Sequence, residues 1–169
     1  MLQDKVQKNC ILTPDIIKRK LRRIALQIAE DNAGENALLI AGINGNGEVL
    51  ASKLSDELQQ LLNIQISMTT IRLNKREPIE VSVVHEQDYT NKVIIVVDDV
   101  SNTGRTLLYA LKPFLQSIPK KIQTAVLVER SHKLYAVQPD YVGLSVSTTL
   151  QEHISVETEG DTILGAWLH

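Results

Sequence analysis

The sequence has little of several residue types, and each shortage excludes a class of protein. Its 169 residues include one cysteine, Cys10, which excludes an intrachain disulfide and any metal site built from several cysteines. Aromatic residues make up only 4%, so the core must consist mainly of Ile, Leu and Val. No apolar run approaches the ~20 residues of a membrane span, and the polar segment 1–8 lacks the apolar centre of a signal peptide. We therefore expect a cytoplasmic protein with no membrane partner.

Charge is also nearly balanced, with a formal net charge of -2. Such a chain has no overall electrostatic attraction to nucleic acid or to an anionic membrane. The hydrophobic fraction of 43% and the charged fraction of 22% are typical of a folded globular protein. The length fits one domain, and no linker or repeat divides it, so we expect a single domain over residues 1–169.

Strand-like and helix-like segments alternate along the chain. Thr13, Pro14 and Asp15 supply a capping hydroxyl, a first-turn proline and a first-turn acid, and a helical apolar stripe follows as far as residue 32. A second helix is expected at about 48–62 and a third from about Thr103 to before Pro119. Strands are expected at 37–43, 64–73, 79–84, 93–97, 122–128, 141–146, 153–157 and 162–168. This alternation predicts an α/β fold with a mostly parallel sheet flanked by helices.

The most informative segment begins with the strand at 93–97, which ends in the paired acids Asp98 and Asp99. In an open α/β sheet, ligands bind beyond the carboxyl ends of the strands. Two carboxylates at that end can accept hydrogen bonds from the vicinal hydroxyls of a ribose. The residues that follow are small, hydroxylic or flexible, as a backbone cradle for a phosphate requires, and they are Ser101, Asn102, Thr103, Gly104, Arg105 and Thr106.

Two other nucleotide sites are excluded by motif. The chain has no G-x-x-x-x-G-K-[ST] sequence, so it has no P-loop. The glycines at 42, 45 and 47 do not follow the G-x-G-x-x-G order of a dinucleotide site.

The string from residue 93 to residue 107 closely resembles the 5-phosphoribosyl-1-pyrophosphate (PRPP) signature of type I phosphoribosyltransferases. Segments 17–32, 42–47, 124–132 and 139–143 also resemble one subfamily, the bifunctional pyrimidine-operon attenuation regulator and uracil phosphoribosyltransferase. The resemblance implies a type I phosphoribosyltransferase fold with a small hood, and a homodimer or larger homo-oligomer. It implies transfer of a phosphoribosyl group from PRPP to a nucleobase, with Mg²⁺ bound mainly through PRPP.

Residue roles follow from the same resemblance. Asp98 and Asp99 would fix the ribose as the catalytic pair, and the segment 101–106 would hold the 5′-phosphate. The remaining roles fall into three sets: a turn that faces the pyrophosphate (Ile43, Asn44, Gly45 and Asn46), a lid (Arg72, Lys75 and Arg76) and base contacts (Arg130, Asp140, Tyr141 and Val142). The three lid residues are alternatively plain solvated charges of a loop.

Two positions bear on the base. Purine enzymes of this class commonly carry an Asp at the position of Asn102 and a Lys at the position of Glu129. An amide cannot accept a proton at neutral pH, and a carboxylate repels the 6-oxo group of a purine. Both residues favour a pyrimidine such as uracil.

Two alternatives stay open. Asn44 and Asn46 stand where the regulator family has basic residues, which is compatible with a PRPP- or nucleotide-binding protein of little catalysis. Arg22, Arg23 and Lys133 could meet the phosphates of RNA, or be ordinary solvated charges, so an RNA-binding regulator is possible but disfavoured. We expect His132 near the base or a subunit contact, and structural roles for the other three histidines at 85, 153 and 169.

Overall fold

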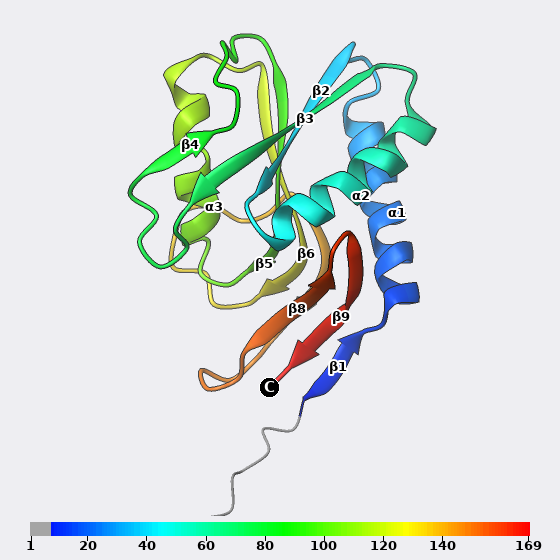
Figure 1. Ribbon diagram of the computed structural model, residues 1–169, viewed down its shortest axis with the longest axis vertical. Helices are drawn as coiled ribbons and strands as arrows, with labels where there is room; N and C mark the ends of the chain where they lie inside the picture. The colour runs from blue at the N-terminus through cyan, green and yellow to red at the C-terminus, as the bar shows by residue number, and fades with distance from the viewer. Residues whose placement is uncertain (1–7) are drawn as a thin grey trace, which may run out of the picture.

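The structure is a computed structural model that describes residues 8–169, and these residues form two sheets (Figure 1). The larger sheet has six strands in the order β4-β3-β2-β5-β6-β7. All neighbours in it are parallel except β4, which pairs antiparallel with β3. The strands are β2 (Ala37–Ile43), β3 (Gln65–Leu73), β4 (Val81–Val83), β5 (Val93–Ser101), β6 (Lys121–Arg130) and β7 (Tyr141–Val146). The predicted α/β class with a mostly parallel sheet is confirmed.

Helices cover both faces of this sheet, which explains why β5 is apolar without alternation. Ile95 and Val97 point toward α1 (Pro14–Asp31) and α2 (Asn46–Leu61) and belong to the core on that side. Ile94 and Val96 point to the opposite side, where α3 (Arg105–Ala110) and a 3₁₀ helix (Lys112–Gln116) complete a second core. In Figure 1 the central strands lie between these two helical layers.

The first helix begins where the sequence predicts. Thr13 is its N-cap, and the Thr13 hydroxyl accepts a hydrogen bond from the backbone N–H of Ile16 at 3.4 Å. Its buried residues are the predicted stripe with Ala25 added: Ile17, Leu21, Ile24, Ala25 and Ile28. The cap and the stripe are local signals, so the sequence alone suffices to place this helix.

A small antiparallel sheet forms the predicted hood, in the order β1-β9-β8. It consists of β1 (Asn9–Leu12), β8 (Ile154–Glu159) and β9 (Thr162–Leu168), and it lies beyond the end of β5 at the bottom of Figure 1. The sequence analysis did not predict β1. That strand is short, and it exists because its backbone pairs with β9 from the far end of the chain.

Two boundaries differ from the prediction in ways that concern the ligand site. β5 continues through Asp98 and Asp99 to Ser101, because the pairing with β6 extends to Glu129. The following helix is shorter than expected and begins at Arg105. Among the described residues, none of the helices combines the length and hydrophobicity that crossing a membrane requires. The polar segment 1–7 lies outside the described residues.

Candidate functional site

The paired acids lie near the carboxyl end of β5, in the middle of the large sheet. Asp98 is 1% exposed and Asp99 is 8% exposed. The backbone N–H of Asp99 donates to the Asp98 carboxylate at 2.9 Å. Two adjacent buried carboxylates repel each other, so this arrangement requires nearby donors or a cation.

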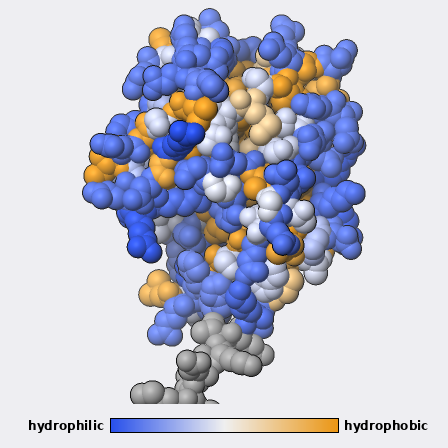
Figure 2. Space-filling view, in the orientation of Figure 1, coloured by the Kyte–Doolittle hydropathy of each residue, from blue (hydrophilic) through white to orange (hydrophobic). Residues whose placement is uncertain are grey.

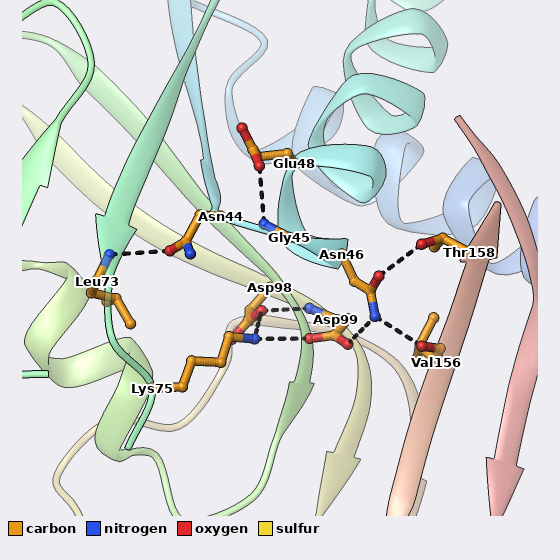
Figure 3. A network of polar contacts seen from close by, with 10 residues as sticks. All are labelled: Asn44, Gly45, Asn46, Glu48, Leu73, Lys75, Asp98, Asp99, Val156 and Thr158. Atoms are coloured by element: carbon orange, nitrogen blue, oxygen red, sulfur yellow. Dashed lines mark hydrogen bonds and ion pairs between the residues drawn. The ribbon is translucent and has the colours of Figure 1, made fainter. Parts of the chain in front are cut away.

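Lys75 supplies that cation from the connection between β3 and β4 (Figure 3). Its ammonium group lies 2.8 Å from Asp98 Oδ1 and 3.2 Å from Asp99 Oδ1. The Lys75 side chain remains 42% exposed, so it reaches the pair from the solvent side. The Arg105 guanidinium donates to the carbonyl oxygen of Lys75 at 3.1 Å, which links this connection to the start of α3.

The two acids have opposite pKa shifts. Burial, together with the neighbouring charge of Asp99, raises the pKa of Asp98 to about 7, although Lys75 opposes the shift. Burial also acts to raise the pKa of Asp99, but Lys75 and the hydrogen bonds from Asp98 and Asn46 outweigh it, so the pKa of Asp99 lies below its usual value. For Lys75, burial is outweighed by both acids, and its pKa is raised. At neutral pH, Asp99 is therefore the more firmly charged of the two acids.

The loop after β5 is compact and closed by its own hydrogen bonds. Thr103 Oγ1 accepts from the backbone N–H of Arg105, and the carbonyl oxygen of Thr103 accepts from the N–H groups of residues 134 and 135. Gly104 has φ +84°, and a Cβ atom there would lie 2.7 Å from the carbonyl oxygen of Val137. The position therefore requires glycine. α3 has only six residues, so the groups available to a phosphate here are the loop's backbone N–H groups and hydroxyls more than a helix dipole.

The turn 43–46 places its two asparagines in different surroundings. Asn44 Oδ1 accepts from the backbone N–H of Leu73 at 3.1 Å, which ties the turn to β3 (Figure 3). Asn46 Nδ2 donates to Asp99 Oδ2 at 3.0 Å and to the carbonyl oxygen of Val156 at 2.8 Å. Asn46 Oδ1 accepts from the Thr158 hydroxyl at 2.9 Å. Asn46 thus joins the acidic pair to the hood, a role that the sequence did not predict.

Glycine also allows the start of α2 to approach the acidic pair. A Cβ atom at Gly47 would lie 2.9 Å from the carbonyl oxygen of Val97 and 3.3 Å from Asp98 Oδ1. The turn and the acids therefore meet at one place, as expected if both contact one ligand.

The three predicted lid residues are placed differently. Arg72 belongs to β3, where it is paired with Ser82 of β4. Together with Asn44 it lines a cavity of about 790 Å³ beside the turn. Lys75 and Arg76 lie in the short connection that follows, and of the three only Lys75 contacts the acidic pair.

A second cavity, of about 460 Å³, contains most of the predicted ribose and phosphate residues. Lys75, Asp98, Asp99 and the segment 101–107 line it, together with Val100, Arg130, His153 and Ile154. The Oδ1 atom of Asn102 is buried and has no hydrogen-bond partner. The sequence analysis assigned His153 a structural role, because no local motif connects it with the loop after β5.

The predicted base contacts are only partly brought together. Arg130 lines the cavity and holds the segment before His153 by donating to Thr148 Oγ1 and, at 2.6 Å, to the carbonyl oxygen of Thr149. Asp140, Tyr141 and Val142 do not line it. Asp140 accepts from the backbone N–H of Thr124 at 2.8 Å, and Tyr141 donates to Asp31 at 2.7 Å. Val142 packs against the second core.

Comparison with known proteins agrees with this geometry. A family model described as "Phosphoribosyl transferase domain" matches residues 10–159. The "Bifunctional protein PyrR" of Staphylococcus carnosus (strain TM300) is 34% identical over an alignment 168 residues long that covers 92% of this chain and 96% of that protein. The protein with the same name from Halalkalibacterium halodurans is 35% identical over 156 residues, covering 85% of this chain and 87% of that protein.

Solved structures agree on the fold. The hypoxanthine phosphoribosyltransferase of Trypanosoma cruzi superimposes with a TM-score of 0.75 at 17% identity, covering 93% of this chain and 96% of that chain. A hypoxanthine-guanine phosphoribosyltransferase from Bacillus anthracis gives a TM-score of 0.68 at 20% identity, covering 82% of each chain.

Proposed function

The chain belongs to the phosphoribosyl transferase domain family, and on this premise we propose that it transfers the phosphoribosyl group of PRPP to a pyrimidine base, with uracil as the favoured substrate. The observation that carries the proposal is the 460 Å³ cavity, in which the buried acidic pair and the segment 101–107 face one space. We also propose that residues 1–169 act as one domain. Location in the cytoplasm stays a prediction.

The acidic pair is proposed to hold the ribose of PRPP. The two carboxylates would accept hydrogen bonds from its vicinal hydroxyls, a role that Lys75 fills in the structure. PRPP must therefore displace the Lys75 ammonium group from the pair. Once displaced, Lys75 would be free to meet the negative charge of the pyrophosphate, which is the lid role that we propose for it together with Arg76 and Arg72.

The loop 101–106 is proposed to bind the 5′-phosphate through backbone N–H groups and the hydroxyls of Ser101, Thr103 and Thr106. With the ribose and the phosphate both held, C1 of the ribose lies in the open part of the cavity. The turn 43–46 would lie on the side of the leaving pyrophosphate, where Asn44 and Asn46 supply amides and no cations. We expect the lack of cations in this turn to weaken pyrophosphate binding by about 1.5–3 kcal/mol for each missing charge-assisted contact.

Mg²⁺ is proposed as the cofactor, bound mainly through oxygens of PRPP. In residues 8–169, no group of three His, Cys, Asp or Glu side chains is gathered to hold an ion. The acidic pair has its oxygens turned toward Lys75 and Asn46, which suits donors such as ribose hydroxyls. Mg²⁺ bound to PRPP would supply charge neutralisation of the pyrophosphate, which the asparagines of the turn cannot.

The preference for a pyrimidine rests on Asn102 and Glu129. Asn102 lines the cavity, and its amide cannot accept the proton that a purine substrate would release. Glu129, at the end of β6, accepts a hydrogen bond from the Ser145 hydroxyl at 2.9 Å and does not line the cavity, so its bearing on the base rests on the resemblance to the family alone. Arg130 is proposed as a base contact from the same strand. Asp140, Tyr141 and Val142 do not line the cavity, so their contact with a base stays a prediction.

Self-association is proposed from the family, as a homodimer or larger assembly. Several large apolar side chains are exposed: Leu115, Ile118, Leu134 and Leu150 are between 66% and 87% exposed. The face shown in Figure 2 carries hydrophobic residues in several separate areas among hydrophilic ones.

A direct test is the release of pyrophosphate from PRPP in the presence of Mg²⁺, measured with uracil, hypoxanthine, guanine, adenine and orotate in separate reactions. The proposal expects turnover with uracil and at most traces with the purines. Turnover with a purine alone would refute the assignment of the base. Absence of turnover with every base, while PRPP still raises the melting temperature, would favour the alternative of a PRPP-binding protein with little catalysis.

A further inference from the structure

His153 lines the 460 Å³ cavity, and its imidazole has no part in the roles proposed above. It lies directly before β8, and its side chain is exposed. Its backbone is fixed by two reciprocal hydrogen bonds with residue 169, from His153 N–H at 2.6 Å and to the His153 carbonyl oxygen at 2.9 Å. The chain just before it is held by Arg130 and by His132, whose ring lies 2.9 Å from the carbonyl oxygen of Thr148. The backbone of His153 is thus fixed where its side chain lines the same cavity as the acidic pair.

Transfer to a pyrimidine requires a group that takes a proton. The bond between the ring nitrogen and C1 of the ribose forms as the C1–oxygen bond to pyrophosphate breaks, and pyrophosphate leaves with the electron pair. The hydrogen on the attacking nitrogen must go to an acceptor. In many enzymes a positioned side chain supplies this acceptor.

The cavity offers few acceptors. Its Lys and Arg side chains are protonated at neutral pH, and the amide of Asn102 takes no proton. Asp98 and Asp99 are proposed to hold the two ribose hydroxyls of PRPP, so their oxygens are occupied when the base reacts. Glu129 does not line the cavity and is bonded to Ser145. Among the residues that line the cavity, this leaves the imidazole of His153.

We propose that His153 is a catalytic residue that accepts the proton of the attacking ring nitrogen as the phosphoribosyl group is transferred. This inference rests on the proposed pyrimidine phosphoribosyltransferase activity. The neutral imidazole becomes an imidazolium, and because the side chain is exposed it returns the proton to solvent after pyrophosphate has left.

A pH profile alone cannot identify this group. The charged or titratable groups that face the same space are Lys75, Asp98, Asp99, Arg105 and Arg130, and the ring of His169 lies 5.6 Å from that of His153. Asp98, with a pKa of about 7, also titrates near neutrality. The acidity of the N–H group of the nucleobase is a better probe. A nucleobase with a more acidic N–H group loses its proton more easily, so its transfer rate depends less on a proton acceptor in the protein.

The experiment compares wild type, His153→Asn and His85→Asn with uracil and with 5-fluorouracil, whose ring N–H groups are more acidic. We expect His153→Asn to lower kcat with uracil by about 100-fold, to lower kcat with 5-fluorouracil clearly less, and to leave the affinity for PRPP unchanged. His85 is a suitable control, because it is exposed, lies outside the cavity and has φ 60°, a conformation that Asn tolerates. A second variant, His153→Ala, should regain activity with added imidazole.

Two results would overturn the inference while leaving the enzyme assignment intact. The first is an unchanged kcat in His153→Asn. The second is an equal loss with both bases, with no recovery of His153→Ala by imidazole. A wild-type protein that is inactive with both bases would instead overturn the proposed function, and this role with it.

Discussion

Asp98 and Asp99 are neighbours of the same residue type, yet their environments separate them. Asp98 is almost fully buried and faces a second carboxylate, so its charged form is disfavoured. Asp99 receives hydrogen bonds from Asn46 and Lys75, so its charged form is favoured. At this scale the site consists of one acid that stays ionised and one whose ionisation depends on pH near neutrality.

The raised pKa of Asp98 predicts how stability depends on pH. The ordinary pKa of an Asp is 3.8 and the folded value is about 7, so between these values the folded protein binds more protons than the unfolded chain. Stability therefore falls as pH rises through this window and remains lower above it. The lowered pKa of Asp99 acts in the opposite direction, but only as pH falls below the ordinary Asp value.

Thermal unfolding at pH 5, 6, 7 and 8 tests this assignment. We expect the melting temperature of Asp98→Asn to rise relative to wild type as the pH increases, because Asn removes the charge that burial disfavours. If the two proteins keep a constant difference across the series, Asp98 does not titrate in this range.

At the residue scale, the sequence indicated which residues gather in one cavity where the signal was local, while their roles stay predictions. The acids and the loop 101–106 form one continuous string, and the structure brings them to one cavity. The contacts of Lys75 and Asn46 with the acidic pair, and the position of His153, depend on chain segments that meet only in the folded protein. No spacing rule along the sequence could indicate them.

At the scale of elements, the site is built where β5, the loop after it and α3 meet. The loop can turn this sharply because Gly104 adopts a left-handed conformation and has no side chain to meet Val137. The shape of the proposed phosphate cradle therefore depends on Gly104.

Replacing Gly104 by Ala tests this dependence. We expect a loss of stability of about 1–3 kcal/mol from the strained backbone, with weaker PRPP binding because the loop must shift away from residue 137. Gly34→Ala is a matched control, since nothing lies within 4 Å of a Cβ atom there. Chemical denaturation and calorimetric titration with PRPP measure both effects. Equal behaviour of the two variants would show that the loop tolerates a side chain at residue 104.

The elements themselves were largely predictable. The helix cap at Thr13 and the apolar runs of β2, β7 and β9 are local patterns, and these three strands have the predicted bounds. β5 is longer than predicted because pairing with β6 continues past its apolar part. β1 was missed because it depends on pairing with β9. Long-range pairing is thus what the sequence patterns did not reveal.

At the scale of the whole molecule, the charge distribution bears on the RNA alternative. The net charge is -2, and two of the basic residues proposed to meet RNA are already engaged within the chain. Arg22 pairs with Glu57 at 2.9 Å, and Arg23 donates to the carbonyl oxygens of Val142 and Gly143 at 2.8 and 2.9 Å. Glu57 offsets the charge of Arg22, and the two carbonyl oxygens occupy N–H donors of Arg23 that a phosphate would need.

We therefore expect attenuator RNA from a pyrimidine operon to bind no more tightly than an unrelated RNA of equal length. Filter binding at several salt concentrations tests this, because the slope of log affinity against log salt counts the phosphate contacts. Tight binding of the attenuator RNA alone, with a steep slope, would instead support the RNA-binding regulator.

The central claim is that the cavity at the carboxyl end of β5 binds PRPP through its acidic pair. The most direct test is calorimetric titration of PRPP with Mg²⁺ into wild type, the double variant Asp98→Asn/Asp99→Asn and the control Asp161→Asn, which alters an exposed turn. Each lost charged contact is worth about 1.5–3 kcal/mol, so the double variant should bind at least about 100-fold more weakly, while the control binds as wild type does. Unchanged PRPP affinity in a folded double variant would contradict the account and place the ligand elsewhere.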